Sequence, residues 1–292
     1  MFGKALSQEL TGKDATVRVM VRDRSKCTLR GPNIEVVTGD IDKPETLPPV
    51  MEGVDTIFLS SPMDAHIGER EIRVIDAAKA AGVTHISKIY GAVKHEDDPL
   101  VATHRQAFDH LKASGISWSL VSPNSVMETG FVNQATTVRL MHALVGCSGH
   151  GKIGMVALKD VTEATAAILI KGGENGMNYE MTGPESIDMF DIADRFSEAL
   201  GKSIVYIDKS VEDFGKMTVK FMKGMTPERL EIEVLCHLRA WRDGKADLVT
   251  DTVQKLTGRK PISVEEWVRM NKALYTKGML PAFIAKWMRK NA

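Results

Sequence analysis

The fold is decided by residues 67–90, which read IGEREIRVIDAAKAAGVTHISKIY. The first part, up to residue 81, carries apolar residues at helical spacing, and residues 84–90 form a short β-branched and apolar run. Gly82 joins the two parts, at the position after a helix where a left-handed backbone favours glycine. A helix that leads through glycine directly into a strand is typical of a sheet wound by crossover helices. The stretch therefore predicts an α/β fold.

The same order of elements repeats on both sides of this stretch. Gly115 and Gly201 each end a predicted helix immediately before a strand. Other strands are predicted over residues 16–22, 34–37, 54–60 and 117–122, and a helix is predicted over residues 103–114. We expect a Rossmann-like, doubly wound parallel sheet in a domain of residues 1–150.

From about residue 124 the pattern becomes mostly helical. Brief strands are expected over residues 152–158, 178–181 and 203–206. Thr226 and the following proline predict the start of a helix that runs to about residue 243, and Ser263 with Glu266 forms a capping-box pattern. Residues 151–292 are therefore expected to form a smaller, mostly helical lobe. It would cover the substrate and be interleaved with the first domain.

The beginning of the chain lacks an element that this fold requires. A doubly wound nucleotide-binding sheet starts with a strand, a glycine-rich turn and a helix whose amino end faces phosphate. Here a predicted helix over residues 3–10 comes first, followed by the strand at residues 16–22. We expect Gly3 to be the last glycine of a Gly-x-x-Gly-x-x-Gly turn whose earlier part, with the first strand, is missing. The alternative is an ordinary terminal glycine.

The composition narrows the function classes. The 292 residues include 38 basic and 38 acidic side chains, 43% apolar residues and 26% charged residues, which is typical of a globular protein. This charge balance argues against a nucleic-acid-coating protein, and no apolar run is long enough for a membrane span. Cys27, Cys147 and Cys236 show no disulfide or metal-ligand spacing. We expect a soluble, cytoplasmic, metal-free protein that is a monomer or homodimer and acts on a small molecule.

Several stretches together resemble one known family. They are VRVMVRDRSKC (17–27), VVTGDIDKPETL (36–47), HRQAFDHLKASGISWSLVSPNSVMET (104–129), GKIGMVALKDVTEATAAIL (151–169), YEMTGPESIDMFDIADRFSEALGK (179–202) and VQKLTGRKPISVEEW (253–267). The chain is similar in these stretches to the NmrA-like group of atypical short-chain dehydrogenases/reductases, which includes NAD(P)H:quinone oxidoreductases of the second type. It departs from the group at Ser122, where an arginine is usual, and at Tyr90, where a small serine is usual.

The resemblance implies an NAD(P)H-dependent oxidoreductase that transfers hydride to a small carbonyl or quinone substrate. Two alternatives remain open because a fold does not determine a function. One is a non-catalytic NADP(H)-binding redox sensor that signals through a partner. The other is a non-redox isomerase on the same scaffold.

Basic residues after the strand at residues 16–22 indicate which dinucleotide is preferred. Arg22, Arg24 and Lys26 lie where the adenosine ribose is expected, and a 2′-phosphate requires a basic partner. We therefore expect NADP(H) to be favoured over NAD(H), with Arg22 and Lys26 as contacts. Asp23 is the competing detail, because a carboxylate suits a ribose hydroxyl. A solvated charged loop is the alternative interpretation.

Two further strand ends are expected to contact the cofactor. The resemblance implies that Asp40 accepts a hydrogen bond from the adenine and that Ile41 packs on the ring. Ser60 and Ser61 precede Pro62, which ends the strand, and these small residues would lie beside the nicotinamide ribose and the diphosphate. An Asx turn at Asp40 and a polar turn at the serines are the alternatives.

A third group is expected around the nicotinamide. The resemblance implies that Pro123, Asn124 and Val126 lie there, and an Asn amide can both donate to and accept from a carboxamide. Tyr90 and Gly91 follow another strand and are expected to contact the same ligand. A simple Pro-Asn turn is the alternative.

Two residues are candidates for proton transfer. Tyr90 and Lys94 match Tyr-x-x-x-Lys, but that dyad requires a helix, and here Gly91 follows a strand, which favours coincidence. His104 is the stronger candidate. It opens the predicted helix at residues 103–114 and lies where the wider family has a catalytic lysine. Imidazole titrates near pH 6.5, so His104 would donate a proton to the oxyanion formed by hydride transfer. A surface histidine is the alternative.

Overall fold

The computed structural model describes residues 1–62, 64–91, 99–222 and 224–290. The chain divides into two compact units, each assembled from several segments. Unit 1 consists of Met1–Tyr90, Glu96–Ser122 and Val161–Glu180. Unit 2 consists of Gly91–His95, Pro123–Asp160 and Met181–Ala292. The domain boundary at residue 150 stays a prediction beside this division.

Unit 1 contains two sheets of parallel strands. In the first, β1 (Val17–Val21) pairs with β2 (Ile34–Thr38). In the second, β4 (His85–Ile89) lies between β3 (Thr56–Leu59) and β5 (Ser117–Pro123), and β9 (Met177–Met181) adjoins β5. The predicted strands are confirmed to within one or two residues at most ends.

The two sheets of unit 1 are not joined by strand pairing. Among the described strands, β1 pairs with β2 alone, and β3 pairs with β4 alone. The interruption between β1 and β3 is the position at which a doubly wound sheet has a central strand.

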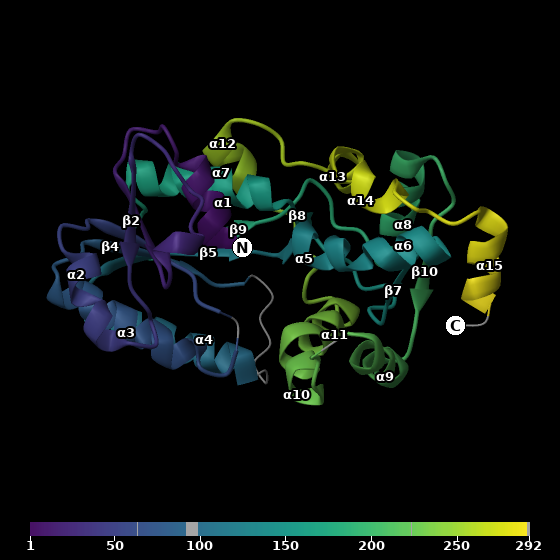
Figure 1. The fold of residues 1–292 in the computed structure, drawn as a ribbon, viewed down its shortest axis with the longest axis horizontal. Coiled ribbons are helices and arrows are strands. Elements are labelled where there is room, and N and C mark those ends of the chain that lie inside the picture. The colour runs from purple at the N-terminus through teal and green to yellow at the C-terminus, as the bar shows by residue number, and fades with distance from the viewer. Residues whose placement is uncertain (63, 92–98, 223, 291–292) are drawn as a thin grey trace. The chain divides into compact units, whose positions relative to one another are not determined.

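Helices cover both faces of these sheets (Figure 1). On one side lie α1 (Phe2–Glu9) and α7 (Leu158–Lys171), whose apolar residues pack with Phe58. On the other side lie α2 (Pro48–Met51), α3 (Ile67–Ala80) and α4 (Pro99–Ser114). Their core with β3 and β4 includes Leu59, Ile75, Ile86 and Leu111. Because side chains alternate along a strand, neighbours in β3 contribute to opposite faces.

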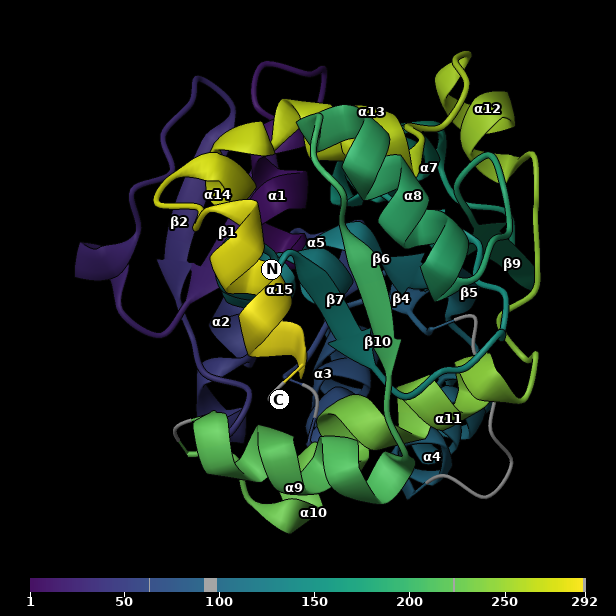
Figure 2. The same ribbon diagram turned by 90° about the vertical axis from the view of Figure 1, so that its right-hand side faces the viewer.

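Unit 2 is mostly helical. Its strands β7 (Ala143–Gly146) and β10 (Val205–Asp208) pair in parallel, as do the short β6 (Ser125–Val126) and β8 (Met155–Val156). Helices α8 (Met189–Leu200) and α13 (Val264–Met270) lie on one side of β7 and β10, and α9 (Val211–Phe221) lies on the other (Figure 2). The remaining helices are α5 (Met127–Phe131), α6 (Ala135–Met141), α10 (Pro227–Leu230), α11 (Cys236–Arg242), α12 (Thr252–Thr257), α14 (Lys272–Thr276) and α15 (Ala282–Lys290).

Three predicted boundaries are wrong. The helix expected from Thr226 to residue 243 is interrupted by a π-helical turn, Glu231–Leu235, although Thr226 caps its start as expected. The strand expected over residues 152–158 shortens to Met155–Val156, because at Gly154 the backbone approaches the Leu248 carbonyl closely. Helix α4 begins at Pro99 instead of residue 103, since proline is well tolerated at the first position of a helix.

Candidate active site

In unit 1, candidate residues follow the carboxyl ends of four strands. Arg22 comes directly after β1, and Asp40 and Ile41 come shortly after β2. Ser60 and Ser61 follow β3, and Tyr90 follows β4. The carboxyl ends of parallel strands are where open α/β sheets bind ligands. The strand positions thus agree with the predicted site, while the assignment of each residue to a cofactor atom stays a prediction.

Beneath this edge, two buried residues that the sequence did not lead us to expect, Glu71 of α3 and Lys88 of β4, form a triad with the half-buried His104 of α4. The Glu71 and Lys88 side chains have no exposed surface, and Lys88 Nζ is 2.6 Å from Glu71 Oε2. The same Nζ is 3.0 Å from Nδ1 of His104 and donates to the Ile89 carbonyl at 3.2 Å. Two of the three N–H donors of the ammonium group are thus used by His104 and Ile89, and the Glu71 carboxylate supplies the counter-charge.

Burial and charge pairing shift the pKa values of Glu71 and Lys88 in opposite directions. Desolvation raises the pKa of Glu71, while Lys88 and the nearby Ser61 hydroxyl oppose that rise. Desolvation also lowers the pKa of Lys88, and Glu71 opposes that shift. Ser61 Oγ is itself buried and has no hydrogen bond of full geometry to a described residue. The contact between Nζ and Oε2 is an ion pair, since neither Glu71 oxygen has a hydrogen bond of full geometry to a described residue.

The third member, His104, does not have the protonation state predicted from the sequence. Burial, and secondarily the Lys88 charge, lower the pKa of His104 to about 3. The expectation of an ordinary titration near pH 6.5 is therefore wrong, because the ring is desolvated and, to a smaller extent, because the Lys88 cation lies next to it. The expectation that His104 opens its helix is also wrong, since α4 starts five residues earlier at Pro99.

The aromatic ring of Tyr90 packs against the triad at His104. Its ring centroid is 5.6 Å from that of His104 in an edge-on arrangement and 5.7 Å from that of Phe108. Lys88 Nζ is 5.5 Å from the same ring. Tyr90 is thus placed next to His104, as a shared role requires. Its predicted partner Lys94 lies outside the described residues, as does most of the segment between them.

The sequence does indicate the Glu71–Lys88 pair, through charged residues at positions that the apolar pattern assigns to the core, although no known motif contains it. Glu71 occupies the core-facing stripe of α3, together with Ile67, Val74, Ile75 and Ala78. Lys88 lies in a five-residue strand that is buried along its whole length. A charged residue in the apolar stripe of a helix, followed by one in a buried strand, indicates an internal ion pair, because buried charges are almost always paired.

The loop after β1 offers cations at the surface. Of the described residues, none pairs with the guanidinium of Arg22 or Arg24, and both side chains are exposed. The Asp23 carboxylate accepts from the backbone and hydroxyl of Ser25, and Lys26 Nζ is 3.3 Å away. These contacts lower the pKa of Asp23. The competing acidic residue is therefore engaged within its own loop.

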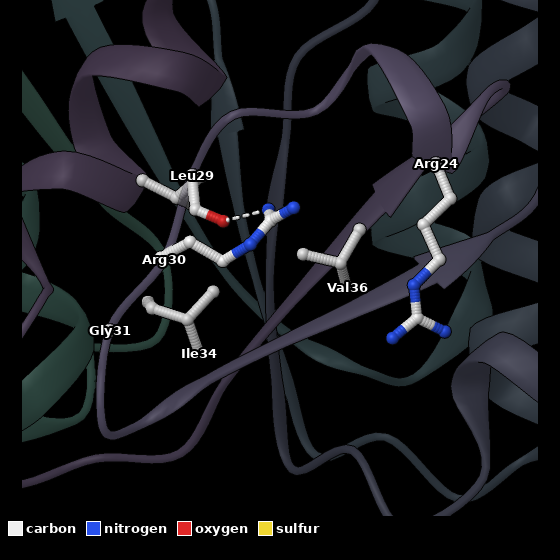
Figure 3. A pocket seen from close by; sticks show the side chains of 6 residues that line it. All are labelled: Arg24, Leu29, Arg30, Gly31, Ile34 and Val36. Carbon is white, nitrogen blue, oxygen red and sulfur yellow. Dashed lines mark hydrogen bonds between the residues drawn. The ribbon is translucent and has the colours of Figure 1, made fainter.

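A hollow adjoins the same loop (Figure 3). It has a volume of about 160 Å³ and is lined by Arg24, Leu29, Arg30, Gly31, Ile34 and Val36. Arg30 donates to the Leu29 and Cys27 carbonyls at 2.6 and 2.9 Å, so its guanidinium is used to hold the loop. Arg24 remains at the rim as the cation without a described partner.

The backbone at the start of α1 leaves free space around Gly3, whereas the backbone after β2 is closely packed around Gly39. At Gly3 an added Cβ would meet nothing within 4 Å, and among described side chains none caps the start of α1. Gly39, in contrast, is packed so closely that a Cβ would lie 2.8 Å from Met20 Sδ. Asp40 Oδ1 accepts from the Asp42 backbone at 3.1 Å, which is an Asx turn, and Ile41 packs against the core under β3.

Three of the four candidate residues in unit 2 are buried, and the fourth is exposed. Pro123, Asn124 and Val126 are buried. Asn124 Nδ2 donates to the Ala246 carbonyl at 2.9 Å, and its backbone N–H donates to the Met181 carbonyl. Gly91 is exposed, and a Cβ there would meet nothing within 4 Å. The Asn124 amide is therefore partly committed to its own unit, and its role toward a nicotinamide stays a prediction.

Two searches of the described residues returned nothing. No group of three or more His, Cys, Asp or Glu side chains is arranged to hold a metal ion. No described helix combines the length and the apolar character needed to cross a membrane.

Comparison with known proteins assigns this architecture. Residues 1–171 of the 292, more than half of the chain, match the model of the NAD(P)H-binding family. An NAD(P)H azoreductase from Xenophilus azovorans is 26% identical over 264 residues, which cover 88% of this chain and 90% of the relative. A (4-alkanoyl-5-oxo-2,5-dihydrofuran-3-yl)methyl phosphate reductase from Streptomyces griseus is 28% identical over 269 residues, covering 90% and 93%.

A solved structure agrees with the fold. The NADPH-dependent quinone oxidoreductase QOR2 of Escherichia coli, complexed with NADPH, matches with a TM-score of 0.84. The match covers 93% of this chain and 96% of that chain, at 23% sequence identity. The predicted Rossmann-like α/β fold and the predicted resemblance are confirmed by these findings.

Proposed function

The chain belongs to the NAD(P)H-binding family, and on that premise we propose that it is an NAD(P)H-dependent oxidoreductase that transfers hydride to a small carbonyl compound or quinone. The observation that carries the proposal is His104, a neutral imidazole held by a buried ammonium beside the carboxyl end of β4. An imidazole in this state can donate a hydrogen bond to an oxygen that gains negative charge.

The relatives support the kind of substrate. Their names describe reductases of azo compounds, of a dihydrofuranone phosphate and of quinones. Acceptors of these kinds are conjugated, and reduction leaves negative charge on a heteroatom that then needs a proton. We therefore propose a conjugated acceptor for this chain, with a quinone or an unsaturated carbonyl compound as the best candidates.

The residues of unit 1 fit a dinucleotide. The amino end of α1 has no described side-chain cap and no acidic residue in its first turn, and Gly3 leaves it open to a close approach by phosphate. The buried Ser61 hydroxyl has an unused hydrogen-bonding capacity at the end of β3. When bound there, NAD(P)H supplies the hydride; the chain binds and orients it and provides the proton.

We further propose that NADP(H) is preferred over NAD(H). Arg22 and Arg24 have no described partner, while Asp23 is occupied by Ser25 and Lys26. A doubly charged 2′-phosphate would gain charge-assisted hydrogen bonds from such guanidinium groups. A 2′-hydroxyl, in contrast, finds its usual carboxylate partner already engaged.

The direct test is steady-state consumption of NADPH by the purified full-length chain with a panel of quinones, unsaturated ketones and azo dyes. We expect turnover with at least one acceptor and loss of most of it in His104→Ala. An exposed histidine of unit 2, replaced in His150→Ala, is the matched control. Tight NADPH binding without turnover of any acceptor would instead support the redox sensor, and turnover without cofactor would support the isomerase.

A further inference from the structure

We propose that Glu71 and Lys88 are positioning residues that hold His104 as the tautomer protonated on Nε2 and that resupply its Nδ1 with a proton during turnover. The static part of this proposal concerns the protein alone. The turnover part rests on the proposed oxidoreductase function.

The tautomer follows from the donors of Lys88. An ammonium group carries no lone pair, so it can only donate to the His104 nitrogen 3.0 Å away. Nδ1 must then be the unprotonated nitrogen, and the ring proton lies on Nε2. Of the described residues, none is a partner of Nε2, and Tyr90 meets the ring at its edge without a hydrogen bond. Among the described residues, the N–H donor of the ring therefore has no acceptor, and we propose that a ligand supplies one.

The charge of Lys88 depends on Glu71. A lysine buried in the middle of β4 would lose its proton without a counter-ion, because desolvation disfavours the charged form. Glu71 faces it across 2.6 Å from α3, and both side chains are fully buried. A neutral Lys88 amine would accept as well as donate, so Nδ1 could then carry the ring proton. Glu71 thus fixes the tautomer through Lys88.

The described residues around the His104 ring contain few charges besides the Lys88 ammonium that could influence its protonation. Lys88 faces His104 from β4, Glu71 lies behind Lys88 on α3, and Tyr90 follows β4. The Ser61 hydroxyl after β3 faces the Glu71 carboxylate. On the helix of His104 itself, the neighbouring Arg105 is exposed. The ammonium is therefore the charge closest to the imidazole among the described residues.

The proton balance of a turnover is closed by the triad. The electron pair comes with the hydride from NAD(P)H and leaves an oxyanion on the acceptor. The Nε2–H bond of His104 breaks and the O–H bond of the product forms, while one Nζ–H bond of Lys88 breaks and an Nδ1–H bond forms. His104 stays neutral as the Nδ1–H tautomer, and Lys88 becomes an amine beside Glu71. After the product leaves, solvent protonates Nε2 while the Nδ1 proton returns to the buried Nζ of Lys88, which restores the starting state. His104 never has to become an imidazolium, a form that the neighbouring ammonium disfavours.

The static part is tested by nitrogen-15 NMR of the histidine rings in the full-length chain. We expect wild-type His104 to be the Nε2–H tautomer, without titration between pH 5 and 8. In Lys88→Met the other tautomer becomes populated and the His104 titration moves to higher pH. Lys112→Met removes a half-exposed lysine from α4, the helix that carries His104, and leaves the His104 tautomer and titration unchanged. The proposal is overturned if wild-type His104 is the Nδ1–H tautomer, or if the His104 signals of Lys88→Met are the same as those of the wild type.

Because Lys88→Met leaves Glu71 buried without its partner, a second variant keeps the test informative. Glu71→Gln with Lys88→Met removes both charges and retains the shape of the pair. We expect it to fold and to show the same mixed tautomers as Lys88→Met. A folded double variant that keeps the pure Nε2–H tautomer contradicts the proposal.

The turnover part has its own readout. If Lys88 resupplies the proton, the double variant loses about 100-fold in kcat, within the range of general acid–base catalysis, while the KM for NADPH stays the same. Its rate then rises toward lower pH, where solvent can protonate the ring. An unchanged kcat would overturn this part. Wild-type inactivity with every acceptor, together with the expected tautomer, would refute the proposed function and leave the static part standing.

Discussion

Arg22 is the exposed side chain on which the proposed preference for NADP(H) most depends. It directly follows β1, and none of the described residues pairs with its guanidinium. We expect Arg22→Ala to weaken NADPH binding by about 10-fold or more, since a hydrogen bond to a charged group contributes about 1.5–3 kcal/mol. NADH binding should barely change. Titration calorimetry with both dinucleotides measures the difference.

The control for Arg22 is Arg269→Ala, which removes an exposed arginine paired with Glu265 on α13. It should leave both affinities as they are. Equal loss of NADH and NADPH affinity in Arg22→Ala would show that Arg22 does not contact a 2′-phosphate.

His104 makes the stability of the fold depend on pH. Its pKa is about 3 in the folded chain against an ordinary value of 6.5, so the unfolded chain binds the extra proton first. The free energy of unfolding therefore falls as the pH drops from about 6.5 toward 3, and this contribution is fully present above pH 6.5. Urea unfolding at several pH values, compared with His104→Gln, isolates it, and the variant should show the shallower decline. Parallel curves for the two proteins would rule the contribution out.

At this scale the sequence is a partial guide. The rule that ligands gather at carboxyl strand ends predicts Arg22, Ser61 and Tyr90 as candidates without any contact being known. Lys88 and Glu71 were missed because motif searches look for charges in loops, whereas this pair lies inside β4 and on the buried stripe of α3. The low pKa of His104 comes first from desolvation and second from Lys88, and both depend on tertiary packing, so no spacing rule could predict it.

Capping residues connect single side chains to whole helices. Ser263 Oγ accepts from the Glu266 backbone N–H at 3.1 Å and begins α13, whose Trp267 is buried in the core of unit 2. Ser263→Ala should lower the free energy of unfolding by about 1 kcal/mol, the usual contribution of a cap. Urea unfolding measures the loss. Ser203→Ala, at an exposed serine outside the helices, is the control. A variant at Ser263 as stable as this control would contradict the assignment of the cap.

The elements themselves were predicted well where their signals are local. Thr226 and Ser263 cap helices as expected, and Gly201 ends α8 in the left-handed conformation. One failure involves distant parts of the chain. The strand expected over residues 152–158 is cut short where Gly151 and Gly154 approach the Trp241 and Leu248 carbonyls, which lie far along the sequence. Such close approaches leave no periodic trace.

At the scale of the whole molecule, the order of helices and strands was enough to predict the α/β architecture. The repeated passage from helix through glycine to strand fixes parallel strands with crossover helices. The assignment of segments to compact units was not predictable in the same way. Residues 161–180 return to unit 1 after a long excursion through unit 2, and only tertiary packing determines where such a segment settles.

The account depends most on one event, the transfer of hydride from the nicotinamide to an acceptor on this chain. NADPH carrying deuterium at the reactive carbon, incubated with the purified chain and the best unsaturated ketone of the panel, tests it by mass spectrometry of the product, because hydride transfer to that acceptor forms a C–H bond that does not exchange with solvent. We predict one deuterium in each reduced product molecule, transferred from a single face of the nicotinamide. Product without deuterium, or intact NADPH beside unreduced acceptor, would contradict the account.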